Sequence, residues 1–142
     1  MQVQEIMNSN VQLADPNMTI SDAARRMRAE NVGALPVGEN DRLIGMVTDR
    51  DIVTRAIADE RSPESTKVRE VMSEHVHYCF DNDDVQRAAD VMAQHQVRRL
   101  PVLSSNKRLV GVVALADIGL SHETAAQGAL KGISEPTGKE RR

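Results

Sequence analysis

The hydrophobic and polar positions of the chain follow one pattern that is written twice. Residues 3–52 align with residues 68–118 at eighteen identical positions, with an offset of 65 residues that grows to 66 after one extra residue near Asn106. The matched segments include 3–7 (VQEIM) with 68–72 (VREVM), 33–37 (GALPV) with 98–102 (RRLPV), and 43–47 (LIGMV) with 109–113 (LVGVV). Internal repeats are structural units, so the pattern predicts two related halves packed about a pseudo-two-fold axis. Two related ligand clefts are expected at the seam.

After a short lead, each half predicts the same order of elements: strand, helix, strand, strand and helix. The helices are predicted from apolar residues at helical spacing, and the strand pairs from apolar runs joined by a polar turn. In the first half, the strand is expected at 11–14, the helix at 20–32, the strand pair at 35–47 and the second helix from Asp51 to about Ala58. In the second half, the same elements are expected at 76–80, at 85–97, at 100–113 and from Asp117 onward.

The repeat also predicts how the chain is divided. We expect a first repeat at 1–58, a polar linker at 59–67, a second repeat at 68–122, and a C-terminal segment at 123–142. This last segment combines a helix near 124–131 with a tail rich in Gly, Pro and charge that is expected to be mobile. Each repeat alone would bury little surface, so the two are expected to share a core.

Composition narrows the class of protein. A net charge of −3 and a pI of about 5.8 argue against a nucleic-acid binder, and an aromatic content of 1% leaves almost no platform for stacking bases. No segment reaches the roughly 20 apolar residues of a membrane span, and the N-terminus lacks the features of a secretory signal. A single cysteine, Cys79, fits a reducing environment. A cytoplasmic protein with an aliphatic core is therefore expected.

The most suggestive local pattern is GMVTDRD at 45–51, a strand that ends in Thr48 and leads to Asp51 at a helix start. The N–H groups of a helix N-terminus attract phosphate, and a threonine hydroxyl can add a hydrogen bond. An aspartate one turn on can accept the hydroxyls of a ribose, as acidic residues do in dinucleotide folds. The same spacing also matches a capping box, which requires no ligand. Both interpretations remain open from this pattern alone.

The second half bears on this choice. Its matching series, GVVALAD at 111–117, has Ala114 in place of Thr48 but keeps an aspartate, Asp117. Half of the capping box is therefore missing, although Asp117 can still favour the helix dipole. The pattern therefore favours a ribose-binding role for Asp117.

Taken together, the repeat, the Leu-Pro-Val before each hairpin, and the GMVTDRDI and HQVRRLPV segments resemble a tandem pair of CBS domains, a Bateman module. The resemblance covers residues 3 to about 120 and points to small stand-alone bacterial members. It implies an α/β (α+β) fold of two pseudo-symmetric CBS units, each strand-helix-strand-strand-helix, packed through their sheets. It also implies a disc-like homodimer. The implied ligands are adenosine compounds: AMP first, then ADP, ATP, NAD or S-adenosylmethionine.

The resemblance also assigns roles to residues. Thr48 and Asp51 match the phosphate and ribose contacts of the first repeat, and Asp117 matches the ribose contact of the second. Arg98 and Arg99 match positions that reach the nucleotide phosphates, whereas the first repeat has Gly33 and Ala34 there. The expected nucleotide-binding set is completed by Asp49 and Arg50 beside Thr48, and by the backbone around Gly33, Ala34, Leu35 and Pro36 and around Leu100 and Pro101.

These differences predict unequal sites. The stronger phosphate site is expected to combine Thr48 and Asp51 with Arg98, and the site built on Asp117 is expected to bind phosphate less well. Alternatively, Arg98 and Arg99 are a solvated pair at a surface edge.

A metal site is not expected, although one arrangement would be competent to form it. His75, His77 and Cys79 alternate along an expected strand and would share one face. A fourth ligand is not evident, and the apolar residues of the opposite face explain the strand as an ordinary amphipathic one.

The sequence is compatible with three classes of function to different degrees. A regulatory module that senses adenosine nucleotides and passes the change to an unknown effector protein is favoured. A CBS-fold interaction protein that binds no nucleotide is the alternative. An enzyme is not predicted, because no triad, P-loop or zinc-hydrolase pattern is present and Asp49 and Asp51 would point apart at a helix start.

Overall fold

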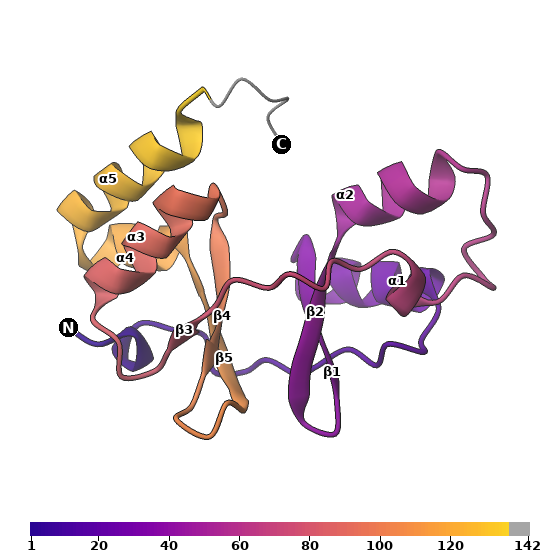
Figure 1. Cartoon of the computed structure of the whole chain (residues 1–142), viewed down its shortest axis with the longest axis horizontal. Coiled ribbons are helices and arrows are strands. Elements are labelled where there is room, and N and C mark those ends of the chain that lie inside the picture. Colours follow the sequence, from indigo (N-terminus) through magenta and orange to yellow (C-terminus); the bar gives the residue numbers. More distant parts are fainter. Residues whose placement is uncertain (137–142) are drawn as a thin grey trace. The chain divides into compact units, whose positions relative to one another are not determined.

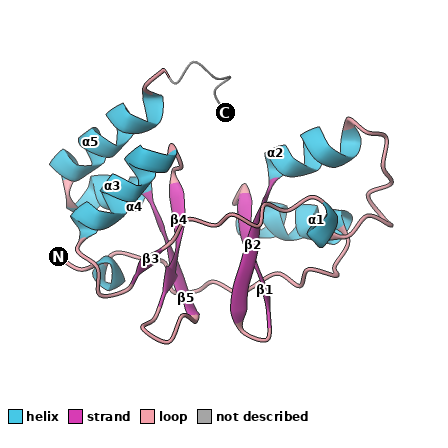
Figure 2. Cartoon of the chain, viewed as in Figure 1, coloured by secondary structure: helices cyan, strands magenta, loops and turns pink. Residues whose placement is uncertain are grey.

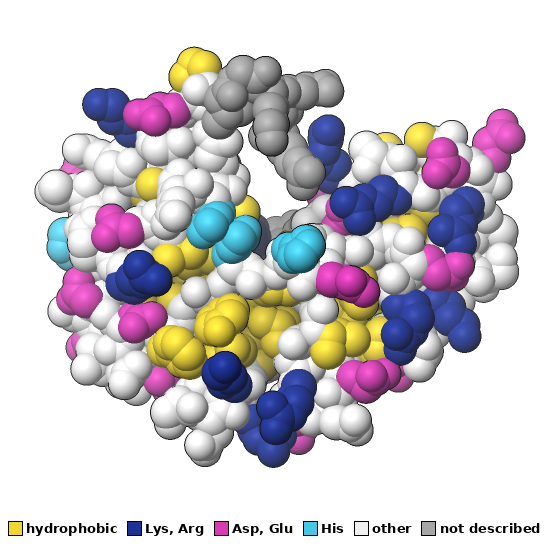
Figure 3. Space-filling model, in the orientation of Figure 1, with side chains coloured by type: hydrophobic (Ala, Val, Ile, Leu, Met, Phe, Trp, Pro, Cys, Tyr) yellow, Lys and Arg dark blue, Asp and Glu magenta, His cyan; other side chains and the backbone are white. Residues whose placement is uncertain are grey.

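The structure, a computed structural model, describes residues 1–136 and divides into two compact units with mixed α and β structure. Unit 1 comprises Met1–Val11 and the chain from His77 onward, and unit 2 comprises Gln12–Val76. Within each unit, helices cover one face of a small sheet (Figures 1 and 2). Acidic and basic side chains are interspersed on the surface displayed in Figure 3.

Unit 2 is built from one hairpin and the helices on either side of it in the sequence. Its elements are α1 (Ile20–Glu30), β1 (Ala34–Glu39), β2 (Arg42–Thr48), α2 (Asp49–Ile52), the π-helical turn η2 (Val53–Ile57) and the 3₁₀ turn η3 (Val68–Glu70). Helix α1 begins at Thr19, whose hydroxyl accepts from the Asp22 N–H at 3.1 Å, and ends at Asn31 in the left-handed conformation. The predicted helix and hairpin are confirmed.

Unit 1 repeats this arrangement and adds one helix. Its elements are η1 (Val3–Glu5), β3 (Cys79–Phe80), α3 (Val85–His95), β4 (Arg99–Leu103), β5 (Leu109–Ala114), α4 (Leu115–Ser121) and α5 (Glu123–Ser134). Helix α3 is capped by Asp84 and ends at Gln96, which has the same left-handed conformation as Asn31. The two units therefore begin and end their first long helices at positions 65 residues apart.

The extended stretches before these helices are shorter than predicted. Of the stretch 76–80 predicted in unit 1, only Cys79 and Phe80 form a strand, which lies parallel to β4. Strand β4 in turn pairs with β5 in antiparallel fashion. In unit 2 the stretch 11–14 contributes a single parallel bridge, from Ala14 to Val37. Pro16 follows closely and has no N–H with which to continue a ladder.

The lead segment of each repeat packs in the unit formed by the other repeat. Val3 lies in the core of unit 1 and Val68 in the core of unit 2. After these residues, Asn8 forms an antiparallel bridge with Val112 of β5, and Ser73 forms the matching bridge with Met46 of β2. The compact units therefore do not follow the boundaries of the sequence repeats.

This crossing explains a glycine that recurs in both halves. A Cβ on Gly45 would lie 2.7 Å from the Ser73 carbonyl oxygen, and one on Gly111 would lie 2.8 Å from the Asn8 carbonyl oxygen. Only glycine allows the lead segment to approach the strand this closely.

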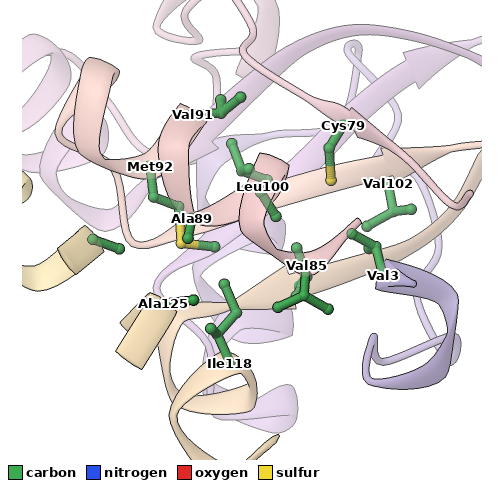
Figure 4. Close-up of a cluster of buried hydrophobic side chains, with 13 residues drawn as sticks. Val3, Cys79, Val85, Ala89, Val91, Met92, Leu100, Val102, Ile118 and Ala125 are labelled. Atoms are coloured by element: carbon green, nitrogen blue, oxygen red, sulfur yellow. The ribbon is translucent and has the colours of Figure 1, made fainter. Parts of the chain in front are cut away.

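Each unit has its own core, so the expectation of one core shared by the two repeats is wrong. Both cores are aliphatic, as the composition predicts. In unit 2 the fully buried side chains include Ile20, Leu35, Val37 and Val47. In unit 1 (Figure 4) the corresponding set is Val3, Val85, Met92, Leu100, Val102 and Ile118, to which Cys79 adds a buried sulfur.

Helix α5 is longer than the sequence predicts. It runs through Ser134, and Gly132 packs closely against Ala93 of α3, where an added Cβ would lie only 2.5 Å from that of Ala93. Part of the expected tail is thus helical, and its last residues, 137–142, lie outside the described residues. None of the helices within residues 1–136 has the length and apolar character of a membrane span.

Cys79 carries a thiol that the fold shields from solvent. The residue is 2% exposed in the core of unit 1, and burial together with the nearby negative charge of Asp83 raises the pKa of the thiol to about 12. The thiolate is the reactive and metal-binding form of cysteine, so at neutral pH this side chain is inert.

The exchange of lead segments predicts where each lead residue contributes stability. Val3→Ala should lower the free energy of unfolding of unit 1 by about 2 kcal/mol, because it removes two buried methyl groups. Hydrogen exchange read by mass spectrometry should detect lost protection in 85–103 while 20–48 keeps its protection. Val68→Ala is the matched control and should give the reverse. Lost protection at 20–48 in Val3→Ala would contradict the packing.

The buried thiol predicts slow modification. Because the raised pKa leaves very little thiolate at pH 8, Cys79 in the folded protein should react with an aromatic disulfide reagent at least about 100-fold more slowly than in urea-unfolded protein. Cys79→Ser supplies the background rate. Equal rates in the folded and unfolded states would show that the thiol is accessible.

Candidate functional site

The start of α2 holds Thr48 and Asp51 in a reciprocal capping box. The Thr48 N–H donates to Asp51 Oδ2 at 2.9 Å, and the Asp51 N–H donates to Thr48 Oγ1 at 3.0 Å. The capping interpretation is therefore realised in this structure. It does not exclude a ligand, because the cap fixes the direction of the carboxylate and uses only one of its oxygens.

The other N–H groups of the first turn are also bonded within the protein. The Asp49 N–H donates to the Gly33 carbonyl at 2.9 Å, and the Arg50 N–H donates to Asp49 Oδ1 at 2.8 Å. A phosphate at this helix start would therefore depend on side chains more than on backbone N–H groups. Thr48 remains suitable, because a hydroxyl that accepts from the Asp51 N–H keeps its own proton for donation.

Asp51 is one of two buried polar residues in the described part of the chain, and its second oxygen faces a cation. The residue is 7% exposed, and its Oδ1 lies 3.8 Å from Nε of Arg55. Arg55 also donates to the Val71 carbonyl at 3.2 Å. Arg55 was not among the residues predicted for the site, although its position four residues after Asp51 on a helix is a signal that the sequence contains.

The start of α4 repeats the carboxylate contact without the hydroxyl. The Ala114 N–H donates to Asp117 Oδ2 at 2.8 Å, whereas Ala114 has no side-chain oxygen to accept in return. The Leu115 N–H donates to the Arg98 carbonyl at 2.8 Å, which matches the bond from Asp49 to Gly33.

The remaining predicted residues lie at the starts of β1 and β4. Ala34 pairs with Thr48, and Arg99 pairs with Ala114, so each strand start lies beside the helix start of its own unit. The four residues that follow, Leu35, Pro36, Leu100 and Pro101, are buried. The side chains of Leu35 and Leu100 belong to the cores, so any ligand contact there would come from the backbone.

The structure thus assembles two related clusters. Thr48, Asp49, Arg50 and Asp51 lie with Gly33 and Ala34 in unit 2, and Asp117 lies with Arg98 and Arg99 in unit 1. Because Arg98 belongs to unit 1, its expected combination with Thr48 and Asp51 stays a prediction.

A groove of about 530 Å³ opens between α1 and α2 of unit 2. It includes Gly33 and Asp49 from the predicted set, but not Thr48 or Asp51. Its remaining lining residues are Ala24, Met27, Arg28, Asn31, Val32, Ile52 and Val53. Most of the groove therefore lies on the helical side of the unit.

The weakly indicated metal site is not formed by the residues considered for it. The strand includes Cys79 but stops short of His75 and His77, and Cys79 is buried. His77 instead stacks on His95 at the end of α3, with ring centroids 3.5 Å apart. Across residues 1–136, no three or more His, Cys, Asp or Glu side chains are grouped so that they could hold a metal ion.

Relatives of known sequence cover nearly the whole chain. The CBS domain-containing protein YhcV of Bacillus subtilis is 44% identical over 135 residues, which are 93% of this chain and 94% of that protein. Hypoxic response protein 1 of Mycobacterium tuberculosis is 43% identical over 115 residues, 80% of each chain.

Solved structures share the fold. A crystal structure of Hypoxic Response Protein I with two coordinated zinc ions aligns with a TM-score of 0.78 and 40% identity, covering 85% of this chain and 98% of that one. A CBS domain pair in complex with 5′-methylthioadenosine and S-adenosyl-L-methionine aligns with a TM-score of 0.76 and 25% identity, covering 87% of this chain and 97% of that one.

The CBS domain family model matches residues 3–57 and 68–118, which are the two halves of the internal repeat. The two matches together span most of the chain and agree with the duplicated helices, hairpins and capping carboxylates. The chain therefore belongs to the CBS domain family and carries two CBS domains in tandem.

Proposed function

We propose that the chain is a regulatory module that binds adenosine nucleotides through residues of both CBS domains and passes the change to an effector protein. The observation that carries this proposal is the pair of matched carboxylates, Asp51 and Asp117. Each is held by a backbone N–H at a helix start and keeps one oxygen outside that bond. The related CBS pair with two bound adenosine compounds supports this class of ligand.

We propose that the parts of a nucleotide are divided among these residues as follows. Asp51 Oδ1, which lies 3.8 Å from Nε of Arg55, accepts a ribose hydroxyl. The Thr48 hydroxyl donates to a phosphate oxygen, and the Arg98 guanidinium adds positive charge. The backbone around Gly33–Pro36 and Leu100–Pro101 accommodates the adenine. AMP is the first candidate, with ADP, ATP, NAD and S-adenosylmethionine as the others.

The two sites are proposed to be unequal. Ala114 has no hydroxyl for a phosphate, so the Asp117 site recognises ribose but binds phosphate less well than the Asp51 site. This difference arises because Thr48 at the end of β2 is matched by Ala114 at the end of β5.

Nucleotide binding would act on the effector protein by shifting a conformational equilibrium of this chain. A nucleotide can change the balance between two arrangements of the CBS domains only by its difference in affinity for them. We propose that the protein works in the cytoplasm as a homodimer and that the affected surface binds an effector protein. A CBS-fold interaction protein that binds no nucleotide is the alternative, and the absence of heat on titration with AMP, ATP and NAD would favour it.

The proposal predicts a loss of AMP affinity in Asp51→Asn. The asparagine carbonyl can still accept from the Thr48 N–H, so the cap is kept while the charged ribose acceptor is lost. The association constant measured by isothermal titration should fall at least about tenfold.

Two comparisons complete this test. Asp117→Asn should have a smaller effect on the stronger binding event, and Asp22→Asn, on the exposed face of α1, should leave AMP binding unchanged. Undiminished AMP affinity in Asp51→Asn would refute the role assigned to Asp51.

A further inference from the structure

The Arg55 side chain joins the Asp51 carboxylate to a segment that is distant in the sequence. Its Nε lies 3.8 Å from Asp51 Oδ1. Its Nη1 donates to the carbonyls of Val71 at 3.2 Å and Met72 at 3.4 Å. A guanidinium carries its N–H donors in a rigid planar fork, so one side chain can hold a carboxylate and two carbonyls at a fixed spacing.

The segment that Arg55 reaches is the lead segment of the second repeat, which is continuous with the connection between the two units. Ser73 fastens this segment to β2, because its N–H donates to the Met46 carbonyl at 2.8 Å and its carbonyl accepts from the Met46 N–H at 2.9 Å. Unit 2 ends at Val76. Arg55 therefore connects the carboxylate to the segment by which the chain leaves unit 2.

The link between Asp51 and Arg55 can be tightened by a ligand. A separation of 3.8 Å is that of an ion pair but exceeds a hydrogen bond. The Arg55 side chain is 46% exposed and can adjust its position, whereas that of Asp51 is 10% exposed and fixed by the cap. An ionised carboxylate oxygen has two lone pairs, so Oδ1 can accept from a ligand hydroxyl and from Arg55 together.

Unit 1 has no arginine at the matching position. The repeat places Ser121 where unit 2 has Arg55. The lead segment of the first repeat still forms the strand bridge from Asn8 to Val112. A serine, however, is uncharged and too short to reach from the Asp117 carboxylate to that segment. The two lead segments are therefore fastened to their strands alike but differ in their link to the site.

The helix backbone also differs between the units at this position. The π-helical turn η2 carries Arg55, and within it the Ala58 N–H donates to the Val53 carbonyl at 2.9 Å, five residues earlier. At the matching position α4 is α-helical as far as Ser121. Single π-helical turns within helices are frequent at functional sites. This change in helix type thus coincides with the residue that makes the link.

We propose that Arg55 is a positioning residue that couples the ribose site at Asp51 to the lead segment of the second repeat. This inference rests on the proposed nucleotide-binding function. A ribose hydroxyl that fixes the Asp51 carboxylate also fixes Arg55 and, through it, the carbonyls of Val71 and Met72. Because Asp117 has no equivalent arginine, the signal reaches the connection between the units from one of the two sites.

Isothermal titration of Arg55→Met tests whether Arg55 acts through Asp51. The association constants for AMP and for adenosine should fall by the same factor, about fivefold, because both ligands carry the ribose. The same substitution in an Asp51→Asn background should have little further effect. Arg25→Met is the matched control: it removes an arginine that pairs with Asp22 on α1 and should leave both affinities unchanged.

Hydrogen exchange read by mass spectrometry tests whether the signal reaches the lead segment. Saturating AMP should slow amide exchange in 68–76 of the wild-type protein and leave 3–11 unchanged. Arg55→Lys keeps the positive charge, but its single nitrogen cannot replace the fork between carboxylate and carbonyls. In this variant, also saturated with AMP, the slowing in 68–76 should be lost. Because both proteins are fully occupied, the difference reports the link and not the affinity.

The outcomes separate this inference from the proposed function. A wild-type protein that binds neither AMP nor adenosine refutes the proposed function and the role of Arg55 with it. If the wild-type protein binds, unchanged affinity in Arg55→Met, an equal loss in the Asp51→Asn background, or retained slowing in Arg55→Lys refutes the coupling alone. A loss confined to AMP would show that Arg55 contacts the phosphate directly, which also overturns the proposal.

Discussion

A hydrogen bond from a backbone N–H to an aspartate carboxylate sets the turn from strand to helix in both CBS domains. In unit 2 it joins Thr48 to Asp51, and in unit 1 it joins Ala114 to Asp117. The bond closes the N-terminus of the helix and fixes the carboxylate at the same time. The carboxylate that caps the helix therefore keeps one oxygen outside the capping bond, which is compatible with the proposed acceptance of a ligand hydroxyl. Helix capping and ribose recognition are therefore compatible uses of one side chain.

The duplicated units differ where a ligand or partner would meet them. Thr48 supplies a hydroxyl at the helix start of one unit, and Ala114 removes it from the other. Unit 1 carries the two arginines, Arg98 and Arg99, while unit 2 has Gly33 and Ala34. In unit 1 helix α5 packs against α3 and α4, whereas in unit 2 a groove of about 530 Å³ opens between α1 and α2. Because the cores and hairpins agree so closely, these differences are the basis for the proposal that the two sites are unequal.

Much of the architecture could be predicted from the sequence, because it depends on local patterns. Apolar residues at helical spacing located α1 and α3, and the polar turns located both hairpins. The exchange of the lead segments could not be predicted, because repeat boundaries show which residues are similar and not which residues pack together. The short strand at Cys79, the length of α5 and the role of Arg55 likewise depend on tertiary contacts. The site residues follow from the family resemblance, and the combination of Arg98 with Thr48 and Asp51 stays a prediction because these residues belong to different units.

Unequal binding of an adenosine nucleotide at two related sites can be followed by amide chemical-shift mapping of the full chain. The protein is titrated with AMP and, in parallel, with adenosine. The amides of Thr48 and Asp51 should shift at lower AMP concentration than those of Ala114 and Asp117. Adenosine, which lacks the phosphate, should reduce this difference. Shifts that appear first at Ala114 and Asp117, or no shift at any of the four amides, would show that the Asp51 site is not the stronger nucleotide site.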